Sequence, residues 1–308
     1  MSRVVYVNGR YAPLHDPLIA VQDRGYQFAD AVYEVWPVRH GRLLDREAHL
    51  LRLARSLGAL SIPRPMSDAA LLAAIKETLR RNRVQDGIAY LQISRGVART
   101  RDHAFPAPQG RPTVVITATQ IKPAALHARA AAGVKAITVP DLRWGRCDIK
   151  TVGLLPNALA RQAAKEAGAV EALFVDADGA ITEGAATNVF IVDADGVLRT
   201  RDLSHAILHG VTRAAIIKAA EELQLRVVEG PFTVAQAKAA REVFLTSAGM
   251  AATAVVAIDG APIGDGEPGP MALKLRTAYL EAALAAAKRT AAASTAGASV
   301  ADSGAAQL

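Results

Sequence analysis

Three short segments hold residue types that could act together on one cofactor. Arg143-Trp144-Gly145-Arg146-Cys147-Asp148-Ile149-Lys150 places a lysine among cationic neighbours, an environment in which lysine can act as an amine nucleophile. Thr182-Glu183-Gly184 supplies a carboxylate that could hold a ring nitrogen protonated. Gly210-Val211-Thr212 opens a predicted helix, and the free N–H groups of a helix N-terminus bind phosphate. An amine, a carboxylate and a phosphate site together fit pyridoxal phosphate.

The order of these residues resembles the fold-type IV pyridoxal-phosphate enzymes, also called class IV aminotransferases, and most closely their D-amino-acid aminotransferase branch. The family pattern stands here as Glu183, Asn188-Val189-Phe190, Leu198-Arg199-Thr200 and Leu208-His209-Gly210-Val211-Thr212-Arg213. Further resemblance runs from Asp23-Arg24-Gly25-Tyr26-Gln27-Phe28 to Phe244-Leu245-Thr246-Ser247. It therefore covers nearly the whole chain except the tail.

The resemblance implies a role for each residue of a cofactor site. Lys150 matches the Schiff-base lysine, which also moves the α-proton of the substrate. Glu183 would face the pyridine nitrogen, and Arg143 would contact the phenolic oxygen. The residues implied in cofactor binding are Arg52, Arg143, Lys150, Glu183, Leu208, Gly210, Val211, Thr212, Ser247 and Ala248. Relatives usually carry threonine at the position of Ala248, so one hydroxyl contact to phosphate, worth about 1 kcal/mol, is missing here.

Another set of residues indicates the branch of the family. In D-amino-acid aminotransferases a similar Arg-x-His pair and a tyrosine trap the substrate α-carboxylate, and the loop with the pair reaches across a dimer. Arg101, His103 and Tyr33 stand at the matching positions here. Arginine suits this role because a guanidinium can bind a carboxylate through two parallel hydrogen bonds. Branched-chain aminotransferases and aminodeoxychorismate lyases lack the pair as a rule, so the match favours D-amino acids.

The predicted function is therefore transfer of the amino group of a D-amino acid, such as D-alanine, to a 2-oxo acid, such as 2-oxoglutarate, by a homodimer. An aminodeoxychorismate lyase or a branched-chain L-amino-acid aminotransferase of the same fold is the alternative. A non-catalytic vitamin B6 carrier would keep Lys150 but would not need Tyr33, Arg101 and His103. The sequence leaves open the preferred side chain, and also what Ala185 and Ala186 change, since relatives often carry serine there.

Composition argues against several other classes of protein. The net charge is +7, but lysines and arginines are scattered among acids without a stacking motif, so anionic small molecules are expected rather than nucleic acid. No stretch approaches the roughly 18 apolar residues of a membrane span, and Met1 leads into a strand-like segment rather than a signal peptide, so a cytoplasmic protein is expected.

Cys147 is the single cysteine, so no intrachain disulfide is possible, and its side chain is expected to be a small buried filler. No metal site is expected, because His205 and His209 have no third ligand.

Apolar patterning predicts an α+β protein with two domains and a tail. Residues 1–120 read as a small N-terminal α/β domain, whose helices would be capped by Asp45 and Ser67. Residues 121–132 read as a linker, and residues 133–287 as a larger cofactor-binding domain with a mixed sheet. Residues 288–308 are rich in alanine, serine, threonine and glycine, so they are expected to be disordered.

Overall fold

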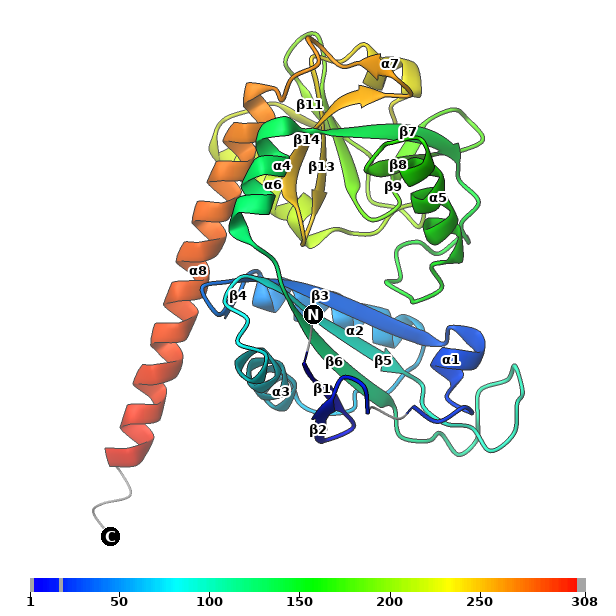
Figure 1. The fold of residues 1–308 in the computed structure, drawn as a ribbon, viewed down its shortest axis with the longest axis vertical. Helices are drawn as coiled ribbons and strands as arrows, with labels where there is room; N and C mark the ends of the chain where they lie inside the picture. Colours follow the sequence, from blue (N-terminus) through cyan, green and yellow to red (C-terminus); the bar gives the residue numbers. More distant parts are fainter. Residues whose placement is uncertain (1–2, 17–18, 304–308) are drawn as a thin grey trace.

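The computed structural model describes residues 3–16 and 19–303, with side chains as far as residue 290. It contains two β-sheets that lie one above the other in Figure 1, and each has its own helices. The chain passes from the first sheet to the second through α4 (Pro123–Ala132), which lies in the predicted linker. The arrangement confirms the predicted α+β class, whereas the exact domain boundaries stay a prediction.

The first sheet is antiparallel and has the strand order β2-β1-β6-β5-β3-β4. Its strands are β1 (Val4–Val7), β2 (Arg10–Pro13), β3 (Ala31–Arg39), β4 (Arg42–Leu43), β5 (Gly87–Ser94) and β6 (Thr113–Gln120). Buried side chains alternate along β5, as expected for a strand with one face on a core. The helices α2 (Arg46–Ala59) and α3 (Asp68–Arg81) supply the other side of that core, and α1 (Arg24–Phe28) is a single turn before β3.

The second sheet is mixed and has the order β12-β11-β10-β13-β14-β7-β8-β9, with β15 paired to β14. Its strands are β7 (Val134–Pro140), β8 (Glu171–Val175), β9 (Ile181–Gly184), β10 (Asn188–Val192), β11 (Leu198–Thr200), β12 (Val227–Glu229), β13 (Glu242–Ser247), β14 (Ala251–Ile258) and β15 (Ala261–Pro262). The surrounding helices are α5 (Leu155–Glu166), α6 (Val211–Glu222), α7 (Val234–Lys238) and α8 (Pro270–Ser303). Every residue of β10 is buried, because apolar clusters lie on both faces of this sheet.

One helix start differs from its prediction. Ser67 caps α3, since its side chain accepts a hydrogen bond from the Ala70 N–H, as expected. Asp45 precedes α2 but makes no side-chain cap, and its backbone is left-handed with φ 49°. Its carboxylate instead accepts a 2.7 Å hydrogen bond from the buried Tyr279 hydroxyl of α8. This tertiary partner replaces the local capping bond and ties the start of α2 to α8.

The last helix is longer than predicted. Disorder was expected from residue 288 onwards, whereas α8 continues to Ser303, and its last turns extend away from both sheets (Figure 1). The extension is rich in alanine, which has the highest helix propensity. Residues 288–303 are therefore helical, whereas their composition predicted disorder. Residues 304–308 lie outside the described residues. None of the helices within residues 3–16 and 19–303 combines the length and apolar character that a membrane crossing needs.

Removal of residues 291–308 is expected to leave the fold intact. The residues of α8 that pack against the apolar cluster of the second sheet run from Met271 to Ala287. The truncated protein should therefore melt within about 2 °C of the full chain and keep its turnover. Differential scanning calorimetry measures this, and a truncation before Tyr279 serves as a destabilised control. A large drop in melting temperature for the short truncation would show that the tail is docked.

Candidate active site

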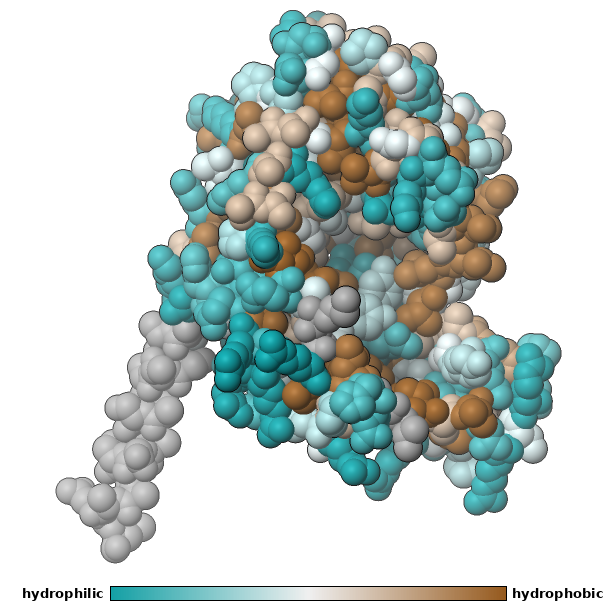
Figure 2. All heavy atoms as spheres, in the orientation of Figure 1, coloured by the Kyte–Doolittle hydropathy of each residue, from teal (hydrophilic) through white to brown (hydrophobic). Residues whose placement is uncertain are grey.

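A cavity of about 290 Å³ lies between the two sheets, where this face of the molecule is hollowed (Figure 2). The elements that line it are β3 and α2 from the first half, and the loop before α5, the β9–β10 turn, the start of α6 and the β13–β14 turn from the second. The residues predicted for cofactor binding all line it, and so does Tyr33. They are Arg52, Arg143, Lys150, Glu183, Leu208, Gly210, Val211, Thr212, Ser247 and Ala248.

Lys150 is held at this cavity by the first half of the molecule. Its carbonyl accepts a 3.0 Å hydrogen bond from the Tyr33 N–H, and its N–H donates to Ser56 Oγ at 3.3 Å. Its Nζ lies 4.1 Å from the centre of the Tyr33 ring, within the range of a cation–π contact. β3 and α2 therefore fix both the backbone and the amine of a residue that belongs to the other half.

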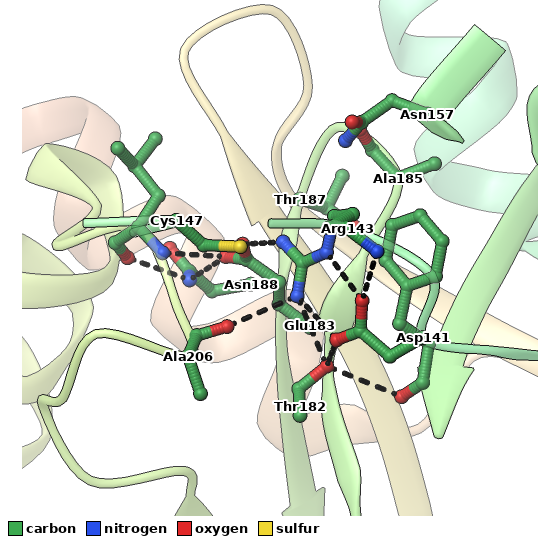
Figure 3. Close-up of polar contacts among 12 residues, drawn as sticks. Asp141, Arg143, Cys147, Asn157, Thr182, Glu183, Ala185, Thr187, Asn188 and Ala206 are labelled. Carbon is green, nitrogen blue, oxygen red and sulfur yellow. Dashed lines mark hydrogen bonds and ion pairs between the residues drawn. The ribbon is translucent and has the colours of Figure 1, made fainter. Parts of the chain in front are cut away.

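Glu183 is buried in the cavity wall, and donors surround its carboxylate (Figure 3). Oε2 accepts hydrogen bonds from Asn188 Nδ2 at 2.9 Å and from the Leu208 N–H at 3.0 Å, while Oε1 accepts from Arg143. Burial raises the pKa of Glu183 to about 7, although Arg143 lowers it. This carboxyl group can therefore exchange a proton with a bound ligand near neutral pH.

Arg143 has partners that the sequence did not predict. Besides Glu183 it donates to both carboxylate oxygens of Asp141, to Thr182 Oγ1 and to the Ala206 carbonyl (Figure 3). Burial lowers its pKa, but the hydrogen bond to Asp141 and the charge of Glu183 outweigh burial and raise the pKa above its usual range. The guanidinium therefore orients Glu183, and its implied contact with a phenolic oxygen stays a prediction.

The start of α6 can accept an anion. Gly210 precedes the helix and no side chain caps it, so the N–H groups of Val211 and Thr212 have no capping partner. A Cβ at Gly210 would overlap Oδ1 of Asn188, which explains why glycine stands there. Among the described residues, Thr246 Oγ1 and His49 Nε2 are buried polar atoms without a hydrogen-bond partner, and both residues line the cavity. Open helix N–H groups and the unpartnered Thr246 hydroxyl, which can donate, fit a ligand that carries phosphate.

Arg52 reaches the cavity from a buried network. Its Nε and Nη2 donate to the Glu34 carboxylate at 2.7 and 2.9 Å, and Nη1 donates to the His209 carbonyl at 3.3 Å. His49 Nδ1 lies 2.8 Å from Glu34 Oε2. Burial lowers the pKa of His49, so this ring is neutral near pH 7 and donates from Nδ1. Sequence reasoning missed Glu34 and His49; an acid at a core-facing position of an apolar strand was the available signal.

Glu34→Gln is expected to lower the free energy of unfolding at pH 7 by about 3 kcal/mol, because it leaves the buried Arg52 without a counter-charge. Burial raises the pKa of Glu34, but Arg52 outweighs it and lowers the pKa to about 2. The stabilisation is thus complete above the unfolded pKa of about 4.5 and is lost as pH falls towards 2. Urea unfolding at several pH values should show the variant and the parent converge in acid.

Glu77→Gln is the matched control for that measurement. Arg80 and Arg81 also lower the pKa of Glu77 to about 2, but this carboxylate lies on the surface, where solvent screens the interaction. Its replacement should leave the unfolding free energy almost unchanged. Equal effects of the two substitutions would show that burial of Glu34 does not determine its contribution.

Arg101 and His103 lie apart from these residues. Both are exposed in the loop between β5 and β6, and among the described residues neither lines the cavity of its own chain. The Arg101 guanidinium carbon lies 4.7 Å from the centre of the Phe28 ring, and the His103 ring centre lies 5.4 Å from it. One chain therefore brings Tyr33 to Lys150 but not the Arg-x-His pair.

Cys147 and Asn157 complete the wall. Cys147 is half-buried at the cavity rather than fully buried, its Sγ lies 3.2 Å from the Trp144 carbonyl, and burial raises the pKa of its thiol to about 11. It is therefore a neutral thiol at pH 7. Asn157 of α5, which sequence reasoning missed, donates to the Ala185 carbonyl at 2.8 Å and fixes the β9–β10 turn (Figure 3).

Comparisons with known proteins identify the family of the chain. Residues 31–258 match the amino-transferase class IV family. The chain is 36% identical to a D-alanine aminotransferase of Bacillus licheniformis over 286 residues, which cover 93% of this chain and 99% of that protein. It is 34% identical to a D-alanine aminotransferase of Staphylococcus aureus (strain N315), over 89% of this chain and 96% of the relative.

Solved structures of aminotransferases have a similar fold. The branched-chain amino acid aminotransferase of T.th., with pyridoxamine 5'-phosphate, has a TM-score of 0.83 and 29% identity, over 92% of this chain and 94% of the other. The Escherichia coli branched-chain enzyme has a TM-score of 0.82 and 25% identity, over 91% and 94%. The protein belongs to the class IV aminotransferases, which confirms the resemblance seen in the sequence.

Proposed function

We propose that the protein is a pyridoxal-phosphate-dependent aminotransferase that moves the amino group of a D-amino acid, such as D-alanine, to a 2-oxo acid, such as 2-oxoglutarate. The observation that carries this proposal is the cavity that brings together Lys150, Glu183 and the open N-terminus of α6. D-alanine aminotransferases are 34–36% identical to the chain, against 25–29% for the branched-chain enzymes above. This difference, together with Arg101 and His103, favours the D-amino-acid reaction.

The residues of the cavity have different roles in the proposed reaction. When bound, pyridoxal 5'-phosphate supplies an aldehyde that condenses with amines and a ring that withdraws electrons from the substrate α-carbon. Lys150 would hold the cofactor through its Nζ and would carry the α-proton of the substrate as a general base and acid. Glu183 would keep the ring nitrogen protonated, and Arg143 fixes the orientation of Glu183.

Other residues of the cavity would hold the phosphate group of the cofactor. Arg52 offers a guanidinium positioned by Glu34, and the N–H groups of Val211 and Thr212 offer a helix N-terminus. Ser247 and the backbone N–H of Ala248 lie in the same wall. Leu208 places its backbone N–H on Glu183, and Gly210 leaves room for Asn188.

A second copy of the chain is proposed to complete the substrate side. Arg101 and His103, which together with Tyr33 would bind the substrate carboxylate, do not line their own cavity among the described residues. Exposed apolar side chains, which a second copy could cover, gather around the cavity mouth and on α5: Leu142, Trp144, Leu154, Leu155 and Leu159. A homodimer in which the loop of one chain enters the cavity of the other would use both features. The cytoplasm is the proposed location of this dimer.

Amino-group transfer to 2-oxoglutarate tests the proposal directly. The purified protein with its cofactor should form pyruvate and glutamate from D-alanine and 2-oxoglutarate, and it should do so much faster than it converts L-leucine. Faster conversion of L-leucine would support the branched-chain alternative. Release of pyruvate from an aminodeoxychorismate would support the lyase. Cofactor absorption without turnover of any of these compounds would indicate a carrier.

A further inference from the structure

The buried side chain of Arg24 points at the loop that carries Arg101 and His103. It is 3% exposed, although it lies at the start of the single-turn helix α1. Its Nη1 donates to the carbonyls of Asp102 at 2.6 Å and Ala104 at 3.2 Å, and its Nη2 donates to the carbonyl of His103 at 3.1 Å. One guanidinium therefore binds three successive carbonyls of an otherwise exposed loop.

This arrangement depends on the planar shape of the guanidinium. Arginine has five N–H donors in a fixed fork, so it can bind several acceptors that a lysine could not reach together. The fourth partner is Asp30, whose Oδ2 accepts from Arg24 Nε at 2.7 Å and balances the buried charge. Asp30 is held in turn by Arg95, which also donates to the carbonyls of Leu60 and Ser61.

The Phe28 ring forms a second contact between α1 and the same loop. The guanidinium carbons of Arg24 and Arg101 lie 4.8 and 4.7 Å from its centre, and the His103 ring also contacts it. The backbone of residues 102–104 and the side chains of Arg101 and His103 are thus both fixed by α1. Exposed loops are in general more mobile than the elements that they connect, so these contacts distinguish this loop.

We propose that Arg24 is a positioning residue that fixes the 102–104 backbone, so that Arg101 and His103 are already oriented for a substrate carboxylate. This inference rests on the proposed function, since it assumes that the pair meets a carboxylate. The loop then loses little conformational entropy when the substrate binds, which strengthens binding. Arg24 acts through the loop and does not itself touch the substrate.

Steady-state kinetics of Arg24→Met test this role. KM for D-alanine should rise by between about ten- and 100-fold, with a much smaller change in kcat, because the carboxylate-binding pair is displaced while Lys150 is not. Conversion of a primary amine without a carboxylate should keep its parental rate. Arg24→Lys should recover part of the affinity for D-alanine.

Asn82→Ala is the matched control for loss of stability. Asn82 links the end of α3 to β1 by hydrogen bonds with the backbone of Val4 and Thr78, far from the loop. This variant should melt earlier than the parent yet keep its KM for D-alanine. Equal increases of KM in the Asn82 and Arg24 variants would overturn the proposal.

Hydrogen exchange gives a readout that does not depend on activity. In Arg24→Met the amides of residues 100–105 should exchange at least about tenfold faster than in the parent, whereas those of β5 should not. Phe28→Leu, which changes a half-buried side chain, should give a smaller effect of the same kind. Unchanged loop exchange in both variants would refute positioning by Arg24, whatever reaction the enzyme catalyses. Faster exchange in a protein inactive with D-alanine would refute only the proposed substrate.

Discussion

Lys150→Ala is expected to lose transamination by about 10⁴-fold or more, together with the visible absorption of the bound cofactor. Lys150 is the only lysine among the described residues that line the cavity, so no neighbouring amine can replace its Nζ. The substitution removes both the covalent attachment point and the group that carries the substrate proton. Stopped-flow spectroscopy and a coupled pyruvate assay measure the two losses separately.

Lys165→Ala provides the matched control, because this exposed lysine on α5 is not among the residues that line the cavity. It should keep both the absorption and the turnover of the parent. Normal turnover of Lys150→Ala would show that another residue is the nucleophile. The phosphate contacts do not involve Lys150, so the variant should still bind pyridoxal 5'-phosphate reversibly in a dialysis experiment.

Elements with a strong local pattern were predicted well. The helix that Gly210-Val211-Thr212 was expected to open is α6, and Ser67 caps α3 as expected, because residues next to each helix start mark it. The cap at Asp45 was wrong because its carboxylate binds Tyr279, more than 200 positions away in the sequence. Contacts of that separation leave no local pattern.

In the site, too, residues of a local sequence motif were predicted, whereas partners distant in sequence were not. Lys150, Glu183 and the start of α6 belong to an ordered motif, and the structure brings them to one cavity. The supporting residues were missed: Asp141 orients Arg143, and Glu34 holds Arg52. Asp141 looks like an ordinary acid in the sequence, and only its core-facing position in an apolar strand distinguishes Glu34. Only the fold shows that these acids are paired with buried arginines.

Arg101→Ala is expected to reduce kcat/KM for D-alanine by roughly 10- to 150-fold, the equivalent of losing a charge-assisted hydrogen bond of about 1.5–3 kcal/mol. Binding of pyridoxal 5'-phosphate should not change, because Arg101 is proposed to bind the substrate carboxylate and is not among the residues proposed to hold the cofactor. Arg99→Ala is the control, since Arg99 is an exposed arginine of the same loop. Unchanged kinetics of Arg101→Ala would remove the carboxylate role and favour the lyase or the L-amino-acid enzyme.

Mixed dimers test whether the loop with Arg101 completes the cavity of its own chain or that of the other chain. In a dimer of one Lys150→Ala chain and one Arg101→Ala chain, the second chain keeps its lysine and would receive Arg101 from the first. Equal mixing should therefore restore about a quarter of the parental sites, because half of the dimers are mixed and each carries one intact site. If each loop served its own chain, no mixed dimer would hold an intact site, and activity would stay at the level of the two variants. Mass spectrometry of the mixture confirms that subunits have exchanged, so an absence of recovery would show that the loop does not cross between chains.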